Sequence, residues 1–165
     1  RESNVDLTDL LHLPGPPGSL GKTDLLLFYG AQTTDYVNAV CGTRFLPNQV
    51  DTSTELGRMV HSMWSQLLGG NWMEGEIFLL RLSLLCRQLG KIKDANPGLG
   101  QHLCHRLVRA KPKEIFWGAR FEITAAASLV SKGIRISGYE TPDFTLEIGE
   151  ETVGVEATGV HPDGV

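Results

Sequence analysis

The sequence predicts an α/β protein in which a mainly helical region, residues 1–111, precedes a smaller core of one helix and a β-hairpin, residues 112–165. Two observations support this prediction. From position 55 to position 132 apolar side chains recur at spacings of three and four residues, as on one face of a helix. After Gly133 they alternate with polar side chains, which is the period of a strand with one buried face.

Capping and helix-breaking residues divide the helical part into four segments. The first begins with a capping-box pair, Thr52 and Glu55, and the second is expected to end at Gly90. Before residue 50 only a short apolar element is expected, over residues 25–29, as a strand or a helical turn. The four expected helices cover residues 53–68, 72–89, 97–110 and 113–132.

The second expected helix has an unusually broad apolar face, which neighbouring elements should cover on both sides. Such a face also allows a partner protein or a homo-oligomer to bind through the helical region. Its apolar residues are Ile77, Phe78, Leu80, Leu84 and Leu85.

Residues 143–148 and 153–158 predict a hairpin whose two-residue turn starts at Gly149. In the register that this turn sets, Asp143 faces Glu156. Side chains directly opposite each other have Cβ atoms about 4.5–5.5 Å apart, so two carboxylates placed there repel one another. A divalent cation between their oxygens would offset the repulsion, because hard cations take carboxylate ligands. The alternative is an exposed hairpin edge at which water solvates both carboxylates.

A third acid, Glu122, falls within the apolar stripe of the helix expected at residues 113–132. It follows Ala119 by three residues and precedes Ala126 by four. A carboxylate on a buried helix face is costly unless a cation or another partner compensates its charge. The alternative is a position at the edge of the stripe, where the side chain reaches water.

Charge is strongly segregated along the chain, although the formal net charge is only −4. Residues 87–120 carry eight basic and two acidic side chains, whereas residues 121–165 carry two basic and eight acidic ones. A basic segment beside an acidic one is typical of a site that holds a polyanion next to a cation. The alternative is a solvated helix face. The candidates for phosphate contacts are Arg106, Arg109, Lys111 and Lys113.

The C-terminal third of the chain resembles a known family. Glu122 on a helix, then Pro142-Asp143-Phe144, a glycine turn, and Val155-Glu156-Ala157-Thr158 resemble the PD-(D/E)XK nuclease superfamily. The resemblance covers roughly residues 112–160 and rests on the order of these motifs. It implies a restriction-endonuclease-like core and metal-dependent hydrolysis of phosphodiester bonds in nucleic acid, with DNA the expected substrate.

The resemblance also implies roles for individual residues. Asp143 and Glu156 would be ligands of Mg²⁺ or Mn²⁺, with the Ala157 carbonyl as a further ligand. Glu122 would be the helix acid that orients the attacking water. In this family the cation lowers the pKa of that water and neutralises charge on the phosphate oxygens.

Thr158 stands where the family has a lysine that stabilises developing negative charge. A neutral hydroxyl can donate a hydrogen bond but supplies no charge. Lys132, at the end of the helix that carries Glu122, is a candidate replacement. The departure leaves a second interpretation open, in which the chain is a catalytically decayed nuclease-like module that binds or serves as a scaffold.

Three cysteines are too few for a disulfide scaffold and favour a reducing, cytoplasmic setting. No stretch reaches the length of about 18 apolar residues that a membrane span needs, so no membrane partner is expected. The chain begins with polar residues and without Met, and the expected core stops soon after its second hairpin strand. We therefore expect it to be part of a longer protein.

Overall fold

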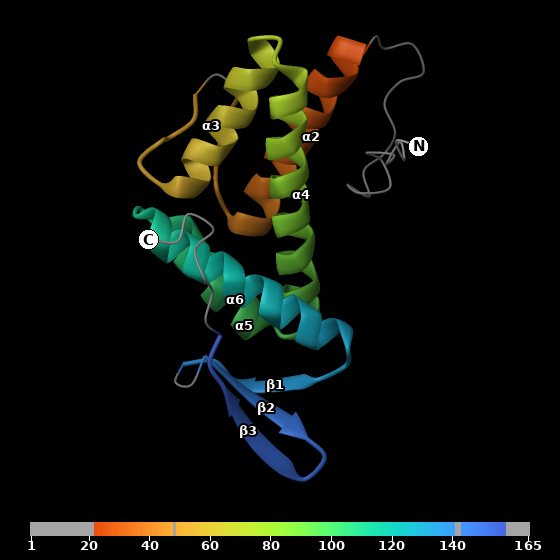
Figure 1. Cartoon of the computed structure of the whole chain (residues 1–165), viewed down its shortest axis with the longest axis vertical. Helices are drawn as coiled ribbons and strands as arrows, with labels where there is room; N and C mark the ends of the chain where they lie inside the picture. Colours follow the sequence, from red (N-terminus) through yellow and green to blue (C-terminus); the bar gives the residue numbers. More distant parts are fainter. Residues whose placement is uncertain (1–21, 48, 141–142, 158–165) are drawn as a thin grey trace. The chain divides into compact units, whose positions relative to one another are not determined.

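The computed structural model describes residues 22–47, 49–140 and 143–157. These residues form five helices and one antiparallel sheet of three strands, so the predicted mixed α/β class is confirmed, with helix predominating (Figure 1). No helix in these ranges combines the length and apolar character needed to cross a lipid bilayer. The elements are α2 (Lys22–Cys41), α3 (Glu55–Leu68), α4 (Trp72–Ala95), α5 (Pro97–Arg109), α6 (Lys113–Ser131), β1 (Arg135–Gly138), β2 (Phe144–Ile148) and β3 (Glu151–Val155).

The chain folds as two compact units that divide between Arg87 and Gln88, inside α4. The sequence predicts a division after residue 111 instead. The structure places α5 in the same unit as α6 and the sheet, so the second unit is larger than predicted.

Helix α2 shows that the expectation of only a short element over residues 25–29 is wrong. Its buried positions recur with helical spacing, but Gly30 and Thr34 occupy two of them in place of large apolar side chains. Gly30 is needed there, because a Cβ atom would lie 2.9 Å from Leu67 Cδ1. These small and hydroxyl-bearing residues hide the helical period in the sequence.

Helix α3 starts from a cap two residues later than predicted. Thr54, and not Thr52, is the N-cap, since Thr54 Oγ1 accepts a hydrogen bond from the Gly57 backbone N–H at 3.2 Å. A Cβ atom at Gly57 would lie 1.8 Å from the Asp51 carbonyl oxygen, so this first turn requires glycine.

Helix α4 continues through Gly90 to Ala95, so the predicted end at Gly90 is wrong. A helical glycine costs about 1 kcal/mol relative to alanine. Leu89 and Ile92, on either side of Gly90, are fully buried. Burying two such side chains outweighs the cost of the glycine.

The predicted inward face of α4 is also partly wrong. Ile77 and Leu84 are 40% and 50% exposed. The buried side of the helix is displaced around its axis, and its fully buried residues up to position 86 are Leu79, Leu82, Leu85 and Cys86.

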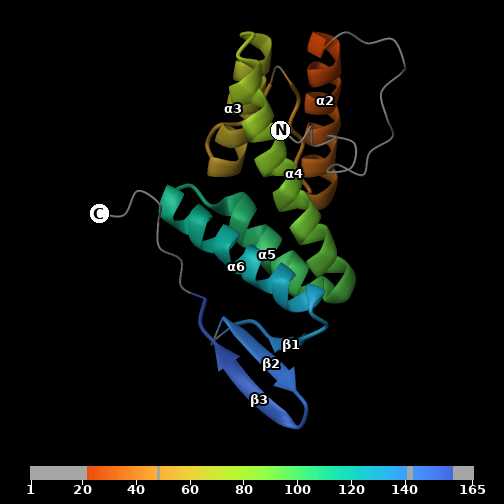
Figure 2. The same ribbon diagram turned by 45° about the vertical axis from the view of Figure 1, so that its right-hand side comes forward.

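Helices α5 and α6 lie beside each other over one face of the sheet, within the second unit (Figure 2). Asn96 connects α5 to the sheet. Its Oδ1 accepts the Leu99 N–H at 3.0 Å and caps α5, while its Nδ2 donates to the Ile136 carbonyl of β1 at 3.0 Å. The predicted start of α5 is therefore confirmed, and its cap also fixes the first strand.

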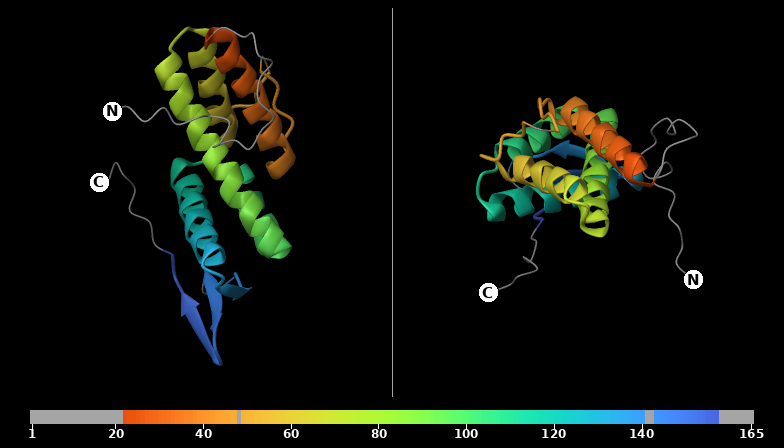
Figure 3. Two further views of the ribbon diagram at one scale, coloured as in Figure 1. Left: turned by 90° about the vertical axis from the view of Figure 1, so that its right-hand side faces the viewer. Right: turned by 90° about the horizontal axis from the view of Figure 1, so that it is seen from above.

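The strands pair in the order β1-β2-β3. The predicted hairpin register is confirmed, with Phe144 opposite Val155 and Ile148 opposite Glu151. Gly149 in the turn has φ 65°, a left-handed conformation that glycine adopts without strain. The open end of the hairpin lies nearer to α6 than its turn does (Figure 3). The register and this placement bring the acids before β2 and after β3 towards the helix that carries Glu122.

Candidate active site

Glu122 lies on the buried face of α6 and is 7% exposed. Its neighbours on that face, Ala119, Ile123 and Ala126, are fully buried. The predicted position of Glu122 inside the apolar stripe is confirmed, and the alternative of an acid at the edge is wrong. The apolar spacing of this helix also predicts Ile115 in the stripe, but Ile115 is 52% exposed.

Arg106 supplies the cation that a buried carboxylate needs. Its Nη1 donates to Glu122 Oε2 from the adjacent helix α5. The side chain of Arg106 is 39% exposed and that of Glu122 is 10% exposed. Arg106 is predicted from the sequence to contact phosphate, but the structure engages it with Glu122 instead. No pattern in the sequence indicates this pairing.

Burial and two neighbouring charges act on the pKa of the Glu122 carboxyl. Burial raises the pKa of this carboxyl above its ordinary value, the positive charge of Arg106 opposes that rise, and the negative charge of Asp143 adds to it. The effect of Asp143 shows that the helix acid and the strand acid lie close enough to interact, although 21 positions separate them in the sequence.

Asp143 immediately precedes β2, where the strand pairing ends at Phe144 and Val155. Its Oδ2 accepts a hydrogen bond from the Ala157 backbone N–H at 2.8 Å. The carboxylate of Asp143 therefore bridges the open end of the hairpin. The described ladder does not extend to the predicted Asp143–Glu156 pair, and the nearest partner of Asp143 is the backbone beyond Glu156.

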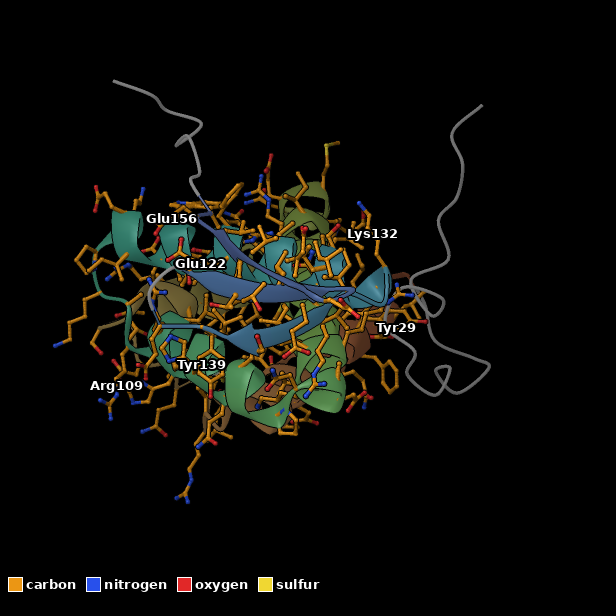
Figure 4. All side chains as sticks on the ribbon, turned by 90° about the horizontal axis from the view of Figure 1, so that it is seen from below. Tyr29, Arg109, Glu122, Lys132, Tyr139 and Glu156 are labelled. Carbon is orange, nitrogen blue, oxygen red and sulfur yellow. The ribbon has the colours of Figure 1, made fainter. Side chains whose placement is uncertain are left out.

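Glu156 follows β3 and is exposed. It forms no hydrogen bond or ion pair with any residue in the described ranges. Figure 4 shows Glu156 and Glu122 towards the same end of the sheet. The three acids thus share one end of the second unit, with Glu122 buried, Asp143 half-buried and Glu156 open to solvent.

Lys132, the candidate replacement for the missing lysine, lies away from this end. It caps the C-terminus of α6, ten residues after Glu122. At 1.5 Å per residue this separation is about 15 Å along the helix axis. Figure 4 shows Lys132 on the opposite side of the view from Glu122. Thr158 and Pro142, which complete the two predicted motifs, lie outside the described residues.

The other predicted phosphate contacts surround the end of α5 and the start of α6. Arg109, Lys111 and Lys113 are all exposed. Arg109 lies in the last turn of α5, where a cation interacts favourably with the helix dipole. These three side chains form an exposed basic segment, whereas Arg106 is turned towards Glu122.

The donor chemistry of the acidic end fits a hard divalent cation, because carboxylate and carbonyl oxygens are the ligands such ions take. Within the described ranges, however, no three His, Cys, Asp or Glu side chains are grouped closely enough to hold a metal ion.

Comparisons with protein-family models, curated proteins and solved structures give no match.

Proposed function

We propose that the second unit hydrolyses phosphodiester bonds of nucleic acid, with DNA as the substrate and Mg²⁺ or Mn²⁺ as the cofactor. The observation that carries this proposal is the effect of Asp143 on the buried carboxyl of Glu122. A buried carboxyl whose ionisation a neighbouring acid disfavours is typical of a site where positive charge is recruited. The order helix acid, Pro-Asp, hairpin, glutamate gives the same function through the resemblance to PD-(D/E)XK nucleases.

In this proposal Asp143, Glu156 and the carbonyl oxygen of Ala157 hold the cation. The hydrogen bond from the Ala157 N–H to Asp143 Oδ2 orients both groups at the open end of the hairpin. The cation supplies Lewis-acid chemistry, which favours loss of a proton from the attacking water and offsets charge on the phosphate.

The remaining residues bind and orient the reactants. Glu122 accepts a hydrogen bond from the attacking water and holds it in line with the phosphate. Arg106 keeps the Glu122 carboxylate in place from α5. Arg109, Lys111 and Lys113 contact phosphates of the nucleic acid and position its backbone without reading its sequence.

A second candidate function is binding without catalysis, by a decayed site of the same origin. The Arg106–Glu122 ion pair favours it, because this pair compensates the buried acid with a cation of the chain itself. Thr158 in place of lysine favours it as well, since it removes a charge that the reaction uses. The two candidates differ in whether phosphodiester bonds are broken and in whether the site binds Mn²⁺.

The test is cleavage of single-stranded and double-stranded DNA and of RNA with Mg²⁺, Mn²⁺ or EDTA. We expect cation-dependent cleavage that Asp143→Asn and Glu156→Gln lower at least about 100-fold, which is the size of effect typical of groups that stabilise transition-state charge. Glu151→Gln is the matched control, because Glu151 is an exposed acid at the other end of β3. Cleavage that survives both site variants contradicts the proposed site.

Isothermal titration with Mn²⁺ separates the two candidates. A catalytic site binds Mn²⁺, loses that binding in Glu156→Gln and keeps it in Glu151→Gln. Nucleic-acid binding that needs no Mn²⁺, without cleavage under any condition, supports the binding module instead.

A further inference from the structure

The part of helix α4 that belongs to the first unit carries a row of exposed or half-buried apolar side chains. We name this row the α4 stripe; its members are Met73, Ile77, Leu80 and Leu84. Their spacing of four, three and four residues places them on one side of the helix. Met73 is 74% exposed, Ile77 40% and Leu84 50%, and Leu80 is half-buried. A continuous row over three turns differs from the isolated exposed apolar residues that any surface contains.

The core does not explain the α4 stripe, because a different side of the helix supplies the core. Leu79, Leu82 and Leu85 are fully buried on that other side. Helix α4 is therefore apolar around most of its circumference, a pattern typical of a helix covered on more than one side. Within the described residues, three members of the α4 stripe stay exposed and Leu80 is only half-buried.

The α4 stripe is symmetric about one point on the helix. Met73 and Leu84 are equally far from the point midway between Phe78 and Leu79, and so are Ile77 and Leu80. A two-fold axis through this point, perpendicular to the helix, would place a second α4 antiparallel to the first. Each Met73 then meets the partner's Leu84, and each Ile77 meets the partner's Leu80. A two-fold interface requires this kind of self-complementary surface.

Charge next to the α4 stripe is symmetric about nearly the same point, one residue nearer the N-terminus. Glu74 and Arg81 are exposed and lie one heptad apart, on the same flank of the stripe. In the antiparallel arrangement each Arg81 comes within about 3 Å, along the axis, of the level of the partner's Glu74. Two equivalent Glu–Arg contacts follow, and no like charges meet on this flank.

We propose that the α4 stripe is the interface of a homodimer, in which two α4 helices pair antiparallel through Met73, Ile77, Leu80 and Leu84. This inference uses only the first unit and does not depend on the proposed function. The occupant is a second copy of this chain because apolar contacts and charge contacts are both satisfied by one two-fold operation.

The first test is the mass of the chain in solution by sedimentation equilibrium. We expect a concentration-dependent dimer, which Leu84→Glu converts to monomer at concentrations where the unmodified chain is dimeric. Leu46→Glu is the matched control, because Leu46 is 52% exposed outside α4. A monomer at concentrations up to about 1 mM, where even weak self-association of about −4 kcal/mol becomes visible, overturns the proposal.

The charge contacts give a sharper test. Arg81→Glu and Glu74→Arg should each weaken the dimer at least several-fold, because each places like charges across the interface. The double variant Glu74→Arg with Arg81→Glu should restore dimerisation, since the exchanged charges again oppose each other. Loss of the dimer in the double variant as well contradicts the antiparallel contact.

Disulfide cross-linking distinguishes antiparallel from parallel pairing of the two α4 helices. A mixture of the Met73→Cys and Leu84→Cys chains should form the mixed disulfide, whereas the Met73→Cys chain alone should form little. Efficient self-linking of Met73→Cys indicates parallel helices and overturns the proposed arrangement. A chain that dimerises only after removal of residues 1–21 identifies those residues as the occupant of the stripe and likewise overturns it.

Discussion

Arg106 on α5 and Glu122 on α6 form an ion pair in which the cation is part-exposed and the carboxylate is buried. The pair joins the two helices of the second unit at the proposed active site. Burial is the largest influence on the pKa of this acid and raises it; Arg106 opposes that rise without cancelling it, and Asp143 adds to it.

Removal of the guanidinium tests this pair. Arg106→Met keeps most of the apolar stem but leaves the Glu122 carboxylate buried without a cation. We expect the free energy of unfolding at neutral pH to fall by about 1–3 kcal/mol, the usual cost of a buried polar group that has lost its partner. Urea unfolding followed by circular dichroism measures it, with Arg109→Met as the exposed control that changes stability by less than about 0.5 kcal/mol. A loss of the same size in both variants contradicts the prediction.

The raised pKa of Glu122 predicts a pH-dependent effect of Glu122→Gln. Between the ordinary and the raised pKa the folded state binds more protons than the unfolded state, so this group lowers stability as pH rises through that window. Glutamine resembles the protonated acid, so the variant does not undergo this loss of stability with rising pH. We expect the variant to be more stable than the unmodified chain above the window and equally stable below it. Thermal unfolding across this pH range measures the difference, and Glu150→Gln, in the exposed hairpin turn, should show no such trend.

The hydrogen bond between the Ala157 N–H and Asp143 Oδ2 closes the open end of the hairpin. Asp143→Ala should accelerate hydrogen exchange of the Ala157 amide by about tenfold, which corresponds to about 1.4 kcal/mol, within the usual net contribution of a protein hydrogen bond. Asp143→Asn keeps an acceptor oxygen and should show a smaller increase. Exchange rates measured by NMR check this, and an unchanged rate in Asp143→Ala would show that the bond contributes nothing in solution.

Thr34 connects α2 to α3 in the first unit. Its Oγ1 donates to the Gly30 carbonyl at 2.8 Å and accepts the Trp64 Nε1–H at 2.9 Å. Thr34→Val preserves the shape but leaves the indole N–H unsatisfied, so we expect a loss of about 1–3 kcal/mol. Thr124→Val, an exposed helical threonine, serves as the control in urea unfolding. Equal stability of the two variants would rule out a contribution from the buried hydroxyl.

Replacement by alanine should have opposite effects on stability at two helical glycines, Gly118 and Gly57. Nothing lies within 4 Å of a Cβ atom at Gly118, so Gly118→Ala should stabilise α6 by about 0.5–1 kcal/mol. At Gly57 the new atom would overlap the Asp51 carbonyl oxygen, so Gly57→Ala should destabilise the first unit. The signs of the two changes in unfolding free energy are the measurement. A stabilising Gly57→Ala would contradict the close approach.

Features that depend on residues close together in the sequence could be predicted from the sequence. Alternation in residues 143–148, together with a glycine turn, predicts the hairpin and its register correctly. The period of α6 places Glu122 on the buried face, and the start of α5 at Pro97 is predicted correctly. Each of these features is decided by backbone geometry over a few residues.

The remaining features depend on contacts between distant residues. Gly30 and Thr34 belong to a helix core only because Leu67 and Trp64 pack against them. Helix α4 continues through Gly90 because residues on both sides of it are buried by the fold.

The sequence by itself determined that a buried acid in α6 needs a compensating cation, and that α4 is too apolar for a helix with one covered face. Only the tertiary structure decided that Arg106 is that cation, and that the uncovered face of α4 runs through Ile77 and Leu84. The physical reason is that periodicity gives the angle of a side chain around its own helix, whereas the neighbouring elements decide which angle is buried.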